Sequence, residues 1–362
     1  MEKVVFLWAL AAGCDLYTCD DPDIVVEAGT CAYLYPDEST WYLSACDAGY
    51  ECGPTNVPSN FTCQRQSPVA IEPAYPGEPC NYDSDCQYSV KYKYGCVKGV
   101  CTGQHQGGLC VDSSECEPGL YCYSASCTQL SAAKQSCTQD TDCVQTCGCD
   151  ILPNALKGTC IPYFSLQANS TISACPGPVP PYTTILSLPT GNNVNYLCES
   201  GSCITSEDTQ VSTCVNPLTS ATAIPVNCTN NDGVCLAGNA LGVAGKCAGC
   251  GMNPTGSSFC PLFSGDGVFP DFVAQTASWF SSKYPQTCNT HRRLDCMATV
   301  WSLSSYQKWL YYSLATWYYP KLATADDCTV QVLLPDFYPL YKQFNGGVNA
   351  ALAAFFVLLV VL

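Results

Sequence analysis

The stretch Cys80-Asn-Tyr-Asp-Ser-Asp-Cys86 recurs twice along the chain, as Cys110-Val-Asp-Ser-Ser-Glu-Cys116 and Cys137-Thr-Gln-Asp-Thr-Asp-Cys143. Each copy places five residues between two cysteines and ends on a hydroxyl-bearing residue followed by an acid. Asp and Ser favour turns because their side chains bond nearby backbone groups. Self-similarity at a period of roughly 20–50 residues predicts an array of small structural units.

Shorter cysteine pairs follow these copies. The first two copies are followed by Cys96-Val-Lys-Gly-Val-Cys101 and Cys122-Tyr-Ser-Ala-Ser-Cys127, and the spacing returns in Cys198-Glu-Ser-Gly-Ser-Cys203. The third copy diverges, through Cys147-Gly-Cys149 to Cys160. We expect the short pairs to form tight β-hairpin tips. The cysteines expected to form disulfides in this region are Cys80, Cys86, Cys96, Cys101, Cys110, Cys116, Cys122, Cys127, Cys137, Cys143, Cys147, Cys149 and Cys160.

The overall composition points to the same kind of fold. The 362 residues include 31 cysteines and 25 prolines, and only 12% are charged. This cysteine content is typical of proteins that fold in an oxidising compartment, where each bridge contributes about 2–4 kcal/mol. We therefore expect small disulfide-rich modules of short β-hairpins and loops in tandem, stabilised by bridges and not by one large core. A small α-helical C-terminal domain is expected to follow them.

Cysteine spacing and proline content divide the chain into eight segments. They are a signal peptide (1–13), a cysteine-rich module (14–68), a linker (69–79), the repeats (80–160), a proline-rich linker (161–197), a second cysteine-rich block (198–260), a helical aromatic-rich domain (261–345) and a hydrophobic C-terminal signal (346–362).

Both ends of the chain are apolar. An uncharged core from Val4 to Ala12 follows Lys3, as in a secretory signal peptide. The segment from Ala350 to Leu362 is too short to span a bilayer and is typical of a glycosylphosphatidylinositol (GPI) attachment signal. A tail anchor and a hydrophobic secreted C-terminus are the alternatives, since the polar spacer is short. The candidate attachment residues are Asn345, Gly346 and Gly347.

The C-terminal region has helical periodicity. Residues 269–284 place Pro270 in a permitted first turn and have one apolar face, formed by Phe272, Thr276, Ala277 and Phe280. Residues 290–317 predict a longer helix, with an apolar stripe of Leu294, Ala298, Trp301, Tyr306, Leu310 and Leu314. We expect the tryptophans here to form a core and not a ligand-binding surface. Cys288 and Cys296 pair either with each other or with Cys328.

The repeat region resembles a known module. Asp83-Ser-Asp85, Ser113-Ser-Glu115, Asp140-Thr-Asp142 and Gly119-Leu-Tyr-Cys122 are similar to the cysteine-rich module at the N-terminus of Dickkopf proteins. They resemble still more the repeated cysteine-rich surface proteins of ciliates and other protists. The resemblance covers residues 80–160 and implies a secreted or surface module that acts by contact. Nothing here matches the second, colipase-like domain of Dickkopf proteins, so their receptor antagonism is not carried over.

Few residues offer reactive chemistry. The net charge of −16 and the lack of a basic stripe argue against a nucleic-acid partner. His105 and His291 are the only histidines, and no nucleophile motif accompanies them, so we expect no enzyme, no catalytic residues and no cofactor. Cys247-Ala-Gly-Cys250 is expected to be structural, not a metal site, and Asp83 with Asp85 leaves weak calcium binding as an alternative. The N-glycosylation acceptors are Asn60, Asn169 and Asn227.

These features favour a non-enzymatic glycoprotein on the extracellular face of the plasma membrane, held by a GPI anchor. It would act in adhesion, recognition or the cell coat on an extracellular protein or glycan ligand. A secreted, self-associating matrix or filament component is the alternative, and a secreted inhibitor or hydrolase is the remaining one. Because 31 is odd, one cysteine is left to pair with another chain, as in a homo-oligomer, unless Cys14 is removed with the signal.

Overall fold

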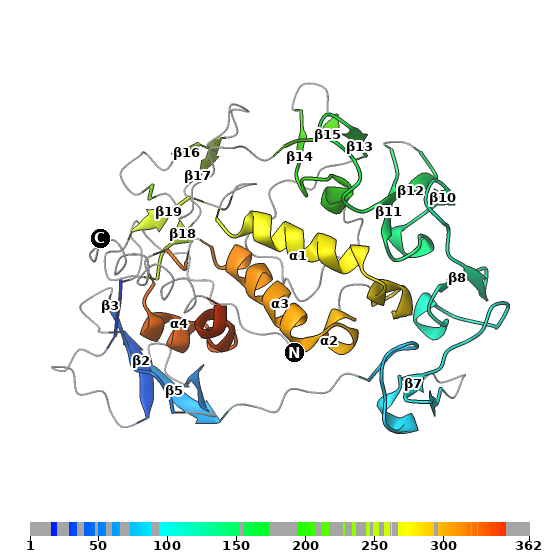
Figure 1. The fold of residues 1–362 in the computed structure, drawn as a ribbon. Coiled ribbons are helices and arrows are strands. Elements are labelled where there is room, and N and C mark those ends of the chain that lie inside the picture. The colour runs from blue at the N-terminus through cyan, green and yellow to red at the C-terminus, as the bar shows by residue number, and fades with distance from the viewer. Residues whose placement is uncertain are drawn as a thin grey trace, which may run out of the picture. The chain divides into compact units, whose positions relative to one another are not determined.

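The computed structural model (Figure 1) describes residues 16–19, 29–34, 40–47, 50–55, 60–65, 73–87, 94–152, 155–173, 194–206, 211–216, 227–228, 234–236, 244–246, 249–252, 257–260, 262, 267–292, 296–319, 321–323 and 325–344. The predicted signal peptide, the C-terminal signal and the three attachment candidates lie outside these residues. The chain divides into two compact units. Unit 1 comprises residues 1–68, 224–262 and 318–362, and unit 2 comprises residues 69–223 and 263–317.

Unit 1 is built on a five-stranded sheet in the order β1-β3-β2-β5-β4. Its strands are β1 (Leu16–Cys19), β2 (Thr30–Leu34), β3 (Thr40–Leu43), β4 (Tyr50–Pro54) and β5 (Asn60–Arg65). β1 and β3 pair in parallel and the other neighbours are antiparallel. Two disulfides, Cys31–Cys52 and Cys46–Cys63, close this sheet. The predicted module at 14–68 is therefore mainly a sheet.

Helix α4 (Asp327–Leu333) completes the core of unit 1. Asp326 caps it by accepting a hydrogen bond from the Thr329 N–H at 2.7 Å. Val332 packs into the buried cluster of the sheet, and the disulfide Cys19–Cys328 joins β1 to the helix across 309 residues of sequence. Unit 1 also contains two hairpins, β16 (Val234–Leu236) with β17 (Ala244–Lys246) and β18 (Gly249–Cys250) with β19 (Ser258–Phe259).

Unit 2 contains the three predicted repeats. Repeat 1 (residues 74–101) holds the 3₁₀ helix η1 (Asp83–Asp85) and strands β6 (Cys96–Val97) and β7 (Val100–Cys101). Repeat 2 (104–127) holds η2 (Ser113–Glu115), β8 (Leu120–Tyr123) and β9 (Ser126–Gln129, ending just past the repeat). Repeat 3 (131–160) holds β10 (Ser136–Cys137), η3 (Asp140–Asp142), β11 (Cys147–Asp150) and β12 (Gly158–Pro162).

Two of the three expected tight hairpins are present, and the one expected between Cys198 and Cys203 is wrong, because Cys203 lies opposite Cys214 instead. In repeat 1, Lys98 and Gly99 join β6 to β7, and both have positive φ. In repeat 2, Ser124 and Ala125 take the same positions, again with positive φ. Two-residue turns of this kind match the twist of the paired strands.

A fourth repeat follows, which we define as residues 166–214. It contains β13 (Thr171–Ile172), η4 (Val194–Leu197), β14 (Cys203–Thr205) and β15 (Ser212–Cys214), with the same strand order as repeat 3. Residues 166–173 and 194–197 of the predicted proline-rich linker therefore belong to this repeat, and its first two residues belong to β12. Its middle, 174–193, lies outside the described residues. Repeat 3 has an additional cysteine, Cys147, which we leave out when numbering the cysteines of each repeat from first to fourth. The third and fourth cysteines then face each other across the hairpin in all four repeats, as Cys96/Cys101, Cys122/Cys127, Cys149/Cys160 and Cys203/Cys214.

One backbone pattern is shared by the four repeats and shows that they are equivalent. A residue with positive φ donates its N–H to the carbonyl oxygen of the last cysteine of its repeat, at 2.8 Å in each case. These residues are Gly77, Gly107, Lys134 and Asn169. Only two are glycines, so the residue type alone does not reveal the pattern.

The remaining part of unit 2 is helical. It comprises α1 (Phe269–Ser281), the 3₁₀ helix η5 (Tyr284–Thr287), α2 (Met297–Val300) and α3 (Leu303–Trp317). α1 packs against α3 (Figure 1). Trp279 and Phe280 of α1 are buried with Trp309 of α3, and Trp301 packs against them. The predicted tryptophan core is therefore confirmed for these three tryptophans, whereas Trp317 is not part of it. The predicted face of α1 omitted Trp279, which has no exposed surface.

The predicted helix over 290–317 is wrong at its start and in its middle. Residues 289–291 form a turn, since Cys288 pairs with Cys296 and Asn289 binds another part of the unit. The helix is also interrupted at Trp301 and Ser302, where the Ser302 hydroxyl accepts a hydrogen bond from the Ser305 N–H and begins α3. Of the two pairings left open, Cys288–Cys296 is the one formed.

The expected fold class is confirmed: short β-hairpins with many disulfides are followed by a small helical region. The segment predicted as one helical domain, 261–345, is shared between the units, with α1 to α3 in unit 2 and α4 in unit 1. Heavy disulfide bonding indicates an extracellular, secreted-type protein. No helix within the described residues has both the length and the apolar character needed to cross a membrane.

Candidate functional site

The candidate site consists of the four repeats and the loop that joins the first three of them. In each of repeats 1 to 3 the first cysteine pairs with the third, and the second pairs with the fourth. The bonds are Cys80–Cys96, Cys86–Cys101, Cys110–Cys122, Cys116–Cys127, Cys137–Cys149 and Cys143–Cys160. In repeat 4 the second and fourth cysteines pair as Cys198–Cys214, and Cys203 is also disulfide-bonded. Cys147, the remaining cysteine of repeat 3, is buried in β11.

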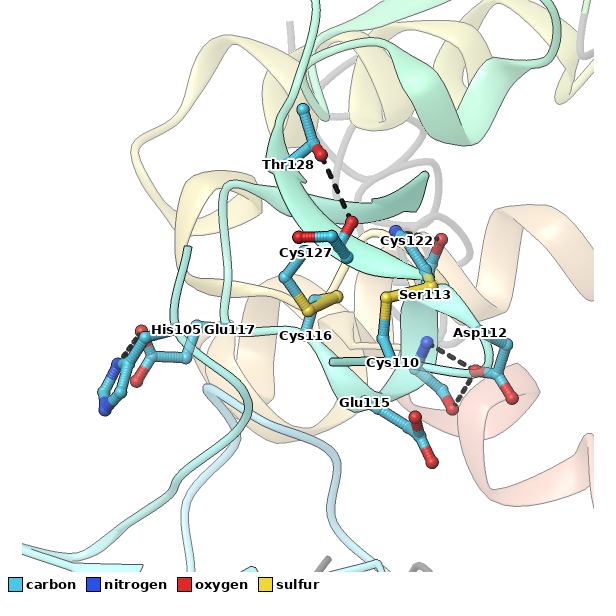
Figure 2. Close-up of a disulfide and its surroundings, with 12 residues drawn as sticks. His105, Cys110, Asp112, Ser113, Glu115, Cys116, Glu117, Cys122, Cys127 and Thr128 are labelled. Atoms are coloured by element: carbon cyan, nitrogen blue, oxygen red, sulfur yellow. Dashed lines mark hydrogen bonds and ion pairs between the residues drawn. A yellow bond between two sulfur atoms is a disulfide. The ribbon is translucent and has the colours of Figure 1, made fainter. Parts of the chain in front are cut away.

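Cystines form most of the interior of repeats 1 to 3. The buried cluster of repeat 2 consists of Cys110, Cys116 and Cys127 (Figure 2). The clusters of repeats 1 and 3 are likewise made mainly of cysteines. Each bridge closes a loop of 11 to 17 residues, for which loop-closure entropy predicts about 3 kcal/mol. These repeats are therefore small frames held by covalent bonds.

The acid before the second cysteine has one role in all three repeats. The Asp85 carboxylate accepts hydrogen bonds from the N–H groups of Asn81 and Tyr82, at 2.8 and 2.9 Å. Glu115 accepts from the Val111 N–H in repeat 2, and Asp142 accepts from the Thr138 N–H in repeat 3. The two bonds to Asp85 lower the pKa of its carboxyl group. These acids cap the turn after the first cysteine.

The first residue of each 3₁₀ helix caps the hairpin. Asp83 accepts a hydrogen bond from the Cys96 N–H, Ser113 from the Cys122 N–H and Asp140 from the Cys149 N–H. The donors belong to the outer strand of each hairpin, where an open N–H would invite pairing with another chain. The carboxylates proposed as a weak calcium site thus bind backbone donors in the described structure.

The hairpins present residues that differ between repeats. Residues that lie opposite each other in register are on the same face of a sheet. In each repeat, three residues on neighbouring segments lie opposite one another in this way, and we call these three residues the outer row. The outer rows are Pro79, Val100 and Val97 in repeat 1, Leu109, Ser126 and Tyr123 in repeat 2, and Ser136, Thr159 and Asp150 in repeat 3. Val97, Val100, Leu109 and Tyr123 are all exposed. The disulfides and the caps are the same in repeats 1 to 3, whereas the outer row is mainly apolar in repeats 1 and 2 and polar in repeat 3.

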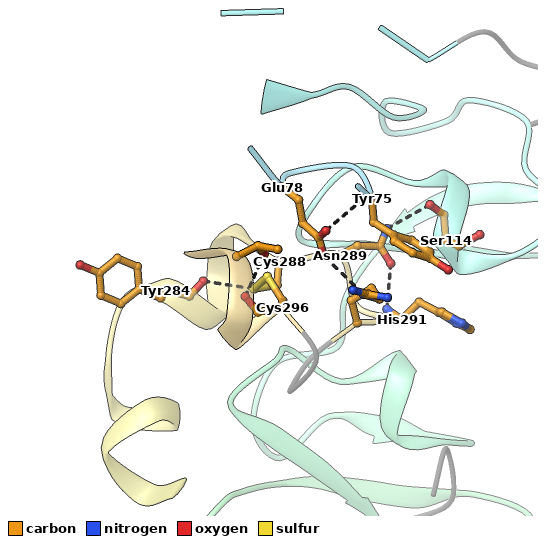
Figure 3. Close-up of polar contacts among 10 residues, drawn as sticks. Tyr75, Glu78, Ser114, Tyr284, Cys288, Asn289, His291 and Cys296 are labelled. Atoms are coloured by element: carbon orange, nitrogen blue, oxygen red, sulfur yellow. Dashed lines mark hydrogen bonds and ion pairs between the residues drawn. A yellow bond between two sulfur atoms is a disulfide. The ribbon is translucent and has the colours of Figure 1, made fainter. Parts of the chain in front are cut away.

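We call residues 288–292 the central loop (Figure 3), and its first residue forms a disulfide with Cys296. Asn289 has no exposed surface, and its side-chain Nδ2 donates to three carbonyl oxygens of repeat 2. The distances are 2.8 Å to Cys116, 3.1 Å to Ser113 and 3.3 Å to Ser114. Its Oδ1 accepts a hydrogen bond from the His291 N–H. Asn289 therefore joins repeat 2 to the central loop through neutral hydrogen bonds.

Repeat 3 binds the same loop one residue further along. The Thr290 hydroxyl donates to the Thr141 carbonyl oxygen at 3.0 Å. In the opposite direction, Gln145 Nε2 donates to the Cys288 carbonyl oxygen at 2.8 Å. Thr290 and Gln145 are both buried. Repeat 3 is thus also held by neutral groups.

Repeat 1 reaches the loop through charge. Glu78 is 1% exposed and lies 3.5 Å from Arg292 Nε, measured from its Oε1. The Arg292 guanidinium stands over the Tyr75 ring at 4.8 Å, and the His291 ring stacks on Tyr75 at 6.0 Å between centroids. The backbone also packs closely, because a Cβ at Gly77 would lie 2.2 Å from the Thr287 carbonyl oxygen.

Repeat 4 is attached by an aromatic core. Tyr163, just before the repeat, packs on Phe280 of α1 with ring centroids 4.3 Å apart, and Leu197 lies in the same buried cluster. Packing here desolvates the Tyr196 phenol and raises its pKa. Leu197 occupies the position of the capping acids Asp85, Glu115 and Asp142, so this repeat replaces a polar cap with apolar contacts.

The predicted modification sites differ in surroundings. Asn169 is exposed in a turn and has positive φ, and Asn227 is exposed and itself forms an isolated β-bridge to Phe259. Asn60 is half-buried in β5, and its Oδ1 has no hydrogen-bond partner among the described residues. His105 lies 2.7 Å from the Glu117 carboxylate on an exposed turn, and His291 belongs to the central loop.

Comparison of the chain with known proteins found no family model, no curated protein and no solved structure that matches it. The resemblance to Dickkopf modules and protist surface proteins therefore stays a prediction. Sequence reasoning missed the central loop and the extent of repeat 4. The short pair Cys198 to Cys203 was the available signal for repeat 4, but nothing in the sequence marks Asn289, Arg292 or Glu78 as partners.

Proposed function

We propose that the chain is a non-enzymatic extracellular glycoprotein, held at the cell surface by a GPI-type anchor, that acts in adhesion, recognition or the cell coat. Its ligand is an extracellular protein or glycan that touches the repeats. The site consists of cystines, capped turns and backbone hydrogen bonds. Groups of this kind fix the positions of surface residues, which suits binding better than catalysis. The exposed acceptors Asn169 and Asn227 support the glycoprotein part of the proposal.

The observation that carries this proposal is the contrast between frame and outer row. Disulfide pairing and caps are the same in repeats 1 to 3, whereas the outer rows change from apolar to polar. Binding surfaces are commonly built this way, with variable residues on a rigid repeated unit. Because the caps occupy the outer-strand donors at Cys96 and Cys122, recognition would use side chains and not added strands.

Paired row variants test the proposal. Val97→Ser with Tyr123→Ser removes apolar surface from repeats 1 and 2, and Ser136→Ala with Thr159→Ala is the matched control in repeat 3. We expect binding of the labelled, purified chain to cells or a glycan array to fall by about tenfold or more in the first variant only. Equal binding by all three proteins would contradict the proposal. Concentration-dependent assembly in sedimentation velocity, abolished by the first variant, would favour the matrix alternative.

The anchor is tested separately on the native protein. Mass spectrometry of the mature C-terminal peptide should find an ethanolamine-glycan remnant on Asn345, Gly346 or Gly347, and phosphatidylinositol-specific phospholipase C should release the chain from cells. An intact tail ending at Leu362 would contradict anchoring and leave the secreted alternative.

A further inference from the structure

The four residues that flank one disulfide of each repeat differ between the repeats. In repeats 1 to 3 the bonded first and third cysteines have Cα atoms 5.9 Å apart, so the residues on either side of them lie close together. These residues are Pro79, Asn81, Gly95 and Val97 in repeat 1, Leu109, Val111, Tyr121 and Tyr123 in repeat 2, and Ser136, Thr138, Gly148 and Asp150 in repeat 3. Of the three repeats, only repeat 2 has a large apolar or aromatic side chain at all four positions. We call its four residues the tyrosine patch.

The tyrosine patch is open to solvent. Leu109, Val111 and Tyr123 are 66%, 64% and 60% exposed, and Tyr121 is half-buried. The two tyrosine rings are neighbours on one face of the hairpin, with centroids 6.1 Å apart. The hairpin and the disulfides hold these side chains on a rigid unit. Exposed apolar clusters that contain aromatic residues are typical of surfaces that bind another protein.

The charges of repeat 2 are of one sign. Residues 104–127 contain three acids, Asp112, Glu115 and Glu117, and no lysine or arginine, whereas repeats 1 and 3 contain both signs. Glu115 caps its turn, and Glu117 pairs with His105. Asp112 and Glu117 project from opposite sides of the repeat (Figure 2). Asp112 is therefore the exposed acid of this repeat that is available to a partner.

Asp112 is held in place with one carboxylate oxygen open. Its Oδ1 accepts hydrogen bonds from the N–H and the hydroxyl of Ser114, and its Oδ2 accepts none within the described residues. The adjacent Ser113 hydroxyl accepts a hydrogen bond from the Cys122 N–H at 3.1 Å, so Asp112 lies beside the strand that carries both tyrosines. No lysine or arginine in the described part of the chain pairs with Asp112 or lies over either ring of the patch.

Tyrosine rings and a carboxylate both attract cations. A lysine or arginine over a tyrosine ring is stabilised by the negative charge density of the ring face. Unit 2 contains such a contact elsewhere, with Lys308 Nζ 6.0 Å from the centroid of the Tyr312 ring. Burial raises the pKa of the Tyr121 phenol, and the nearby charge of Asp142 in repeat 3 raises it further. The patch is therefore both apolar and close to negative charge.

These features favour a protein partner over a glycan. Sites for polar ligands use polar groups that are aimed at the ligand, but polar groups beside the patch are already used within the repeat. The Ser113 hydroxyl and Asp112 Oδ1 accept the hydrogen bonds given above, and the Thr128 hydroxyl donates to the Ser126 carbonyl oxygen at 3.2 Å. The patch thus offers apolar surface and one fixed negative charge.

We propose that the tyrosine patch, with Asp112 beside it, docks a basic segment of an extracellular protein. Lysine or arginine side chains of the segment lie on the tyrosine rings and pair with Asp112, and its apolar side chains cover Leu109 and Val111. This assignment names the chemistry of the ligand left open above, and so it rests on the proposed function.

Short labelled peptides test the chemistry of the partner on the full chain. In these peptides leucine alternates with lysine, with glutamate or with serine. By fluorescence anisotropy, we expect the lysine peptide to bind and the other two to bind weakly or not at all. Its affinity should fall as salt rises from about 0.1 M to about 1 M, which shortens the screening length from about 10 Å to about 3 Å. Equal binding of the three peptides, or binding of none, would overturn the proposal.

Two double variants locate the docking site. Leu109→Ser with Tyr123→Ser removes apolar surface from the patch and should weaken lysine-peptide binding by about tenfold or more. Val97→Ser with Val100→Ser removes exposed apolar surface from repeat 1 and should change binding little. Equal losses in the two variants would overturn the assignment to repeat 2. Binding of the chain to neutral sugars that the first variant abolishes would also overturn it, because the patch would then be a glycan site.

A matched pair of charge variants tests the role of Asp112. Asp112→Asn keeps the acceptor for Ser114 and removes the charge, so lysine-peptide binding should weaken about two- to fivefold. Glu199→Gln removes one charge from an exposed acid of repeat 4 and should leave binding unchanged. Equal effects would mean that the peptide responds to net charge alone, against the proposal. If the chain binds cells but not the lysine peptide, only this inference fails, whereas a chain that binds neither cells nor glycans contradicts the proposed function itself.

Discussion

Repeat 2 and repeat 4 have the same backbone pattern but are stabilised differently. Repeat 2 encloses little besides its cystines, and the acid Glu115 caps its turn. Repeat 4 has Leu197 in the place of that acid and shares a core with Trp279 and Phe280. The same small unit can therefore be stabilised by disulfides with a polar cap, as in repeat 2, or by disulfides together with burial against helices, as in repeat 4. What is constant is the path of the chain, and what varies is the source of its free energy of folding.

The largest expected loss of stability comes from removing an aromatic side chain of the core that repeat 4 shares with α1. Trp279→Ala should lower the free energy of unfolding of unit 2 by about 3–5 kcal/mol, since it leaves a cavity at a position with no exposed surface. Calorimetric unfolding measures the loss. Leu303→Ala, at an exposed residue of α3, is the control and should change little. A loss below about 1 kcal/mol for Trp279→Ala would mean that disulfides also dominate here.

A somewhat smaller loss of stability is expected when a disulfide of repeat 2 is removed. Cys116→Ala with Cys127→Ala opens an 11-residue loop without leaving an unpaired thiol and should cost about 2–4 kcal/mol. Hydrogen exchange should show the loss locally, at the Gly107 and Cys110 N–H groups of repeat 2, while amides of α1 keep their protection. Equal loss in α1 would show that repeat 2 and the helical core unfold as one.

Two glycines at equivalent positions separate packing from backbone strain. Gly77→Ala should destabilise the unit by about 2–3 kcal/mol, because its Cβ would lie 2.2 Å from a backbone oxygen and 2.3 Å from Pro118 Cγ. Gly107→Ala has the same positive φ with nothing within 4 Å, so only strain of about 1–2 kcal/mol is expected. Thermal unfolding of both variants measures the difference. Equal losses would mean that repeat 1 moves aside without penalty.

The smallest effect concerns the polar caps that repeat 4 lacks. Because hydrogen bonds lower the pKa of Asp85 in the folded state, its contribution is present above the pKa of an unfolded aspartate, about 3.9, and is lost as pH falls through the lower folded value. Hydrogen exchange of the Asn81 and Tyr82 N–H groups should show this acid-dependent loss. In Asp85→Asn the protection should be weak at every pH. The Gly77 N–H, bonded to a carbonyl, is the internal control.

Local signals in the sequence were enough to predict the disulfide-rich hairpins. The five-residue gaps and the short pairs at Cys96 and Cys122 depend on turn chemistry within a few residues, and the structure has hairpins there. Disulfide connectivity could not be predicted, because it depends on which cysteines fold together and not on their spacing.

The parts that sequence reasoning missed depend on distant contacts. Asn289 forms a hydrogen bond with Cys116, 173 residues away in the sequence, and Cys19 forms a disulfide with Cys328, 309 residues away. The fourth repeat was hidden because the position of its capping acid holds Leu197, which packs into the core with Trp279 and Phe280. In both cases tertiary contacts, not local propensity, decide the structure.

The Cys19–Cys328 disulfide has a mechanical consequence. Tension applied between the two ends of the chain runs from residue 19 through this bond to residue 328, and bypasses everything between them. Both segments of unit 2, 69–223 and 263–317, lie inside the bypassed length and carry no load. A single proteolytic cut anywhere in that length would likewise leave the two fragments covalently joined. The repeats therefore stay attached to the rest of the chain when its ends are pulled or when this length is cut once.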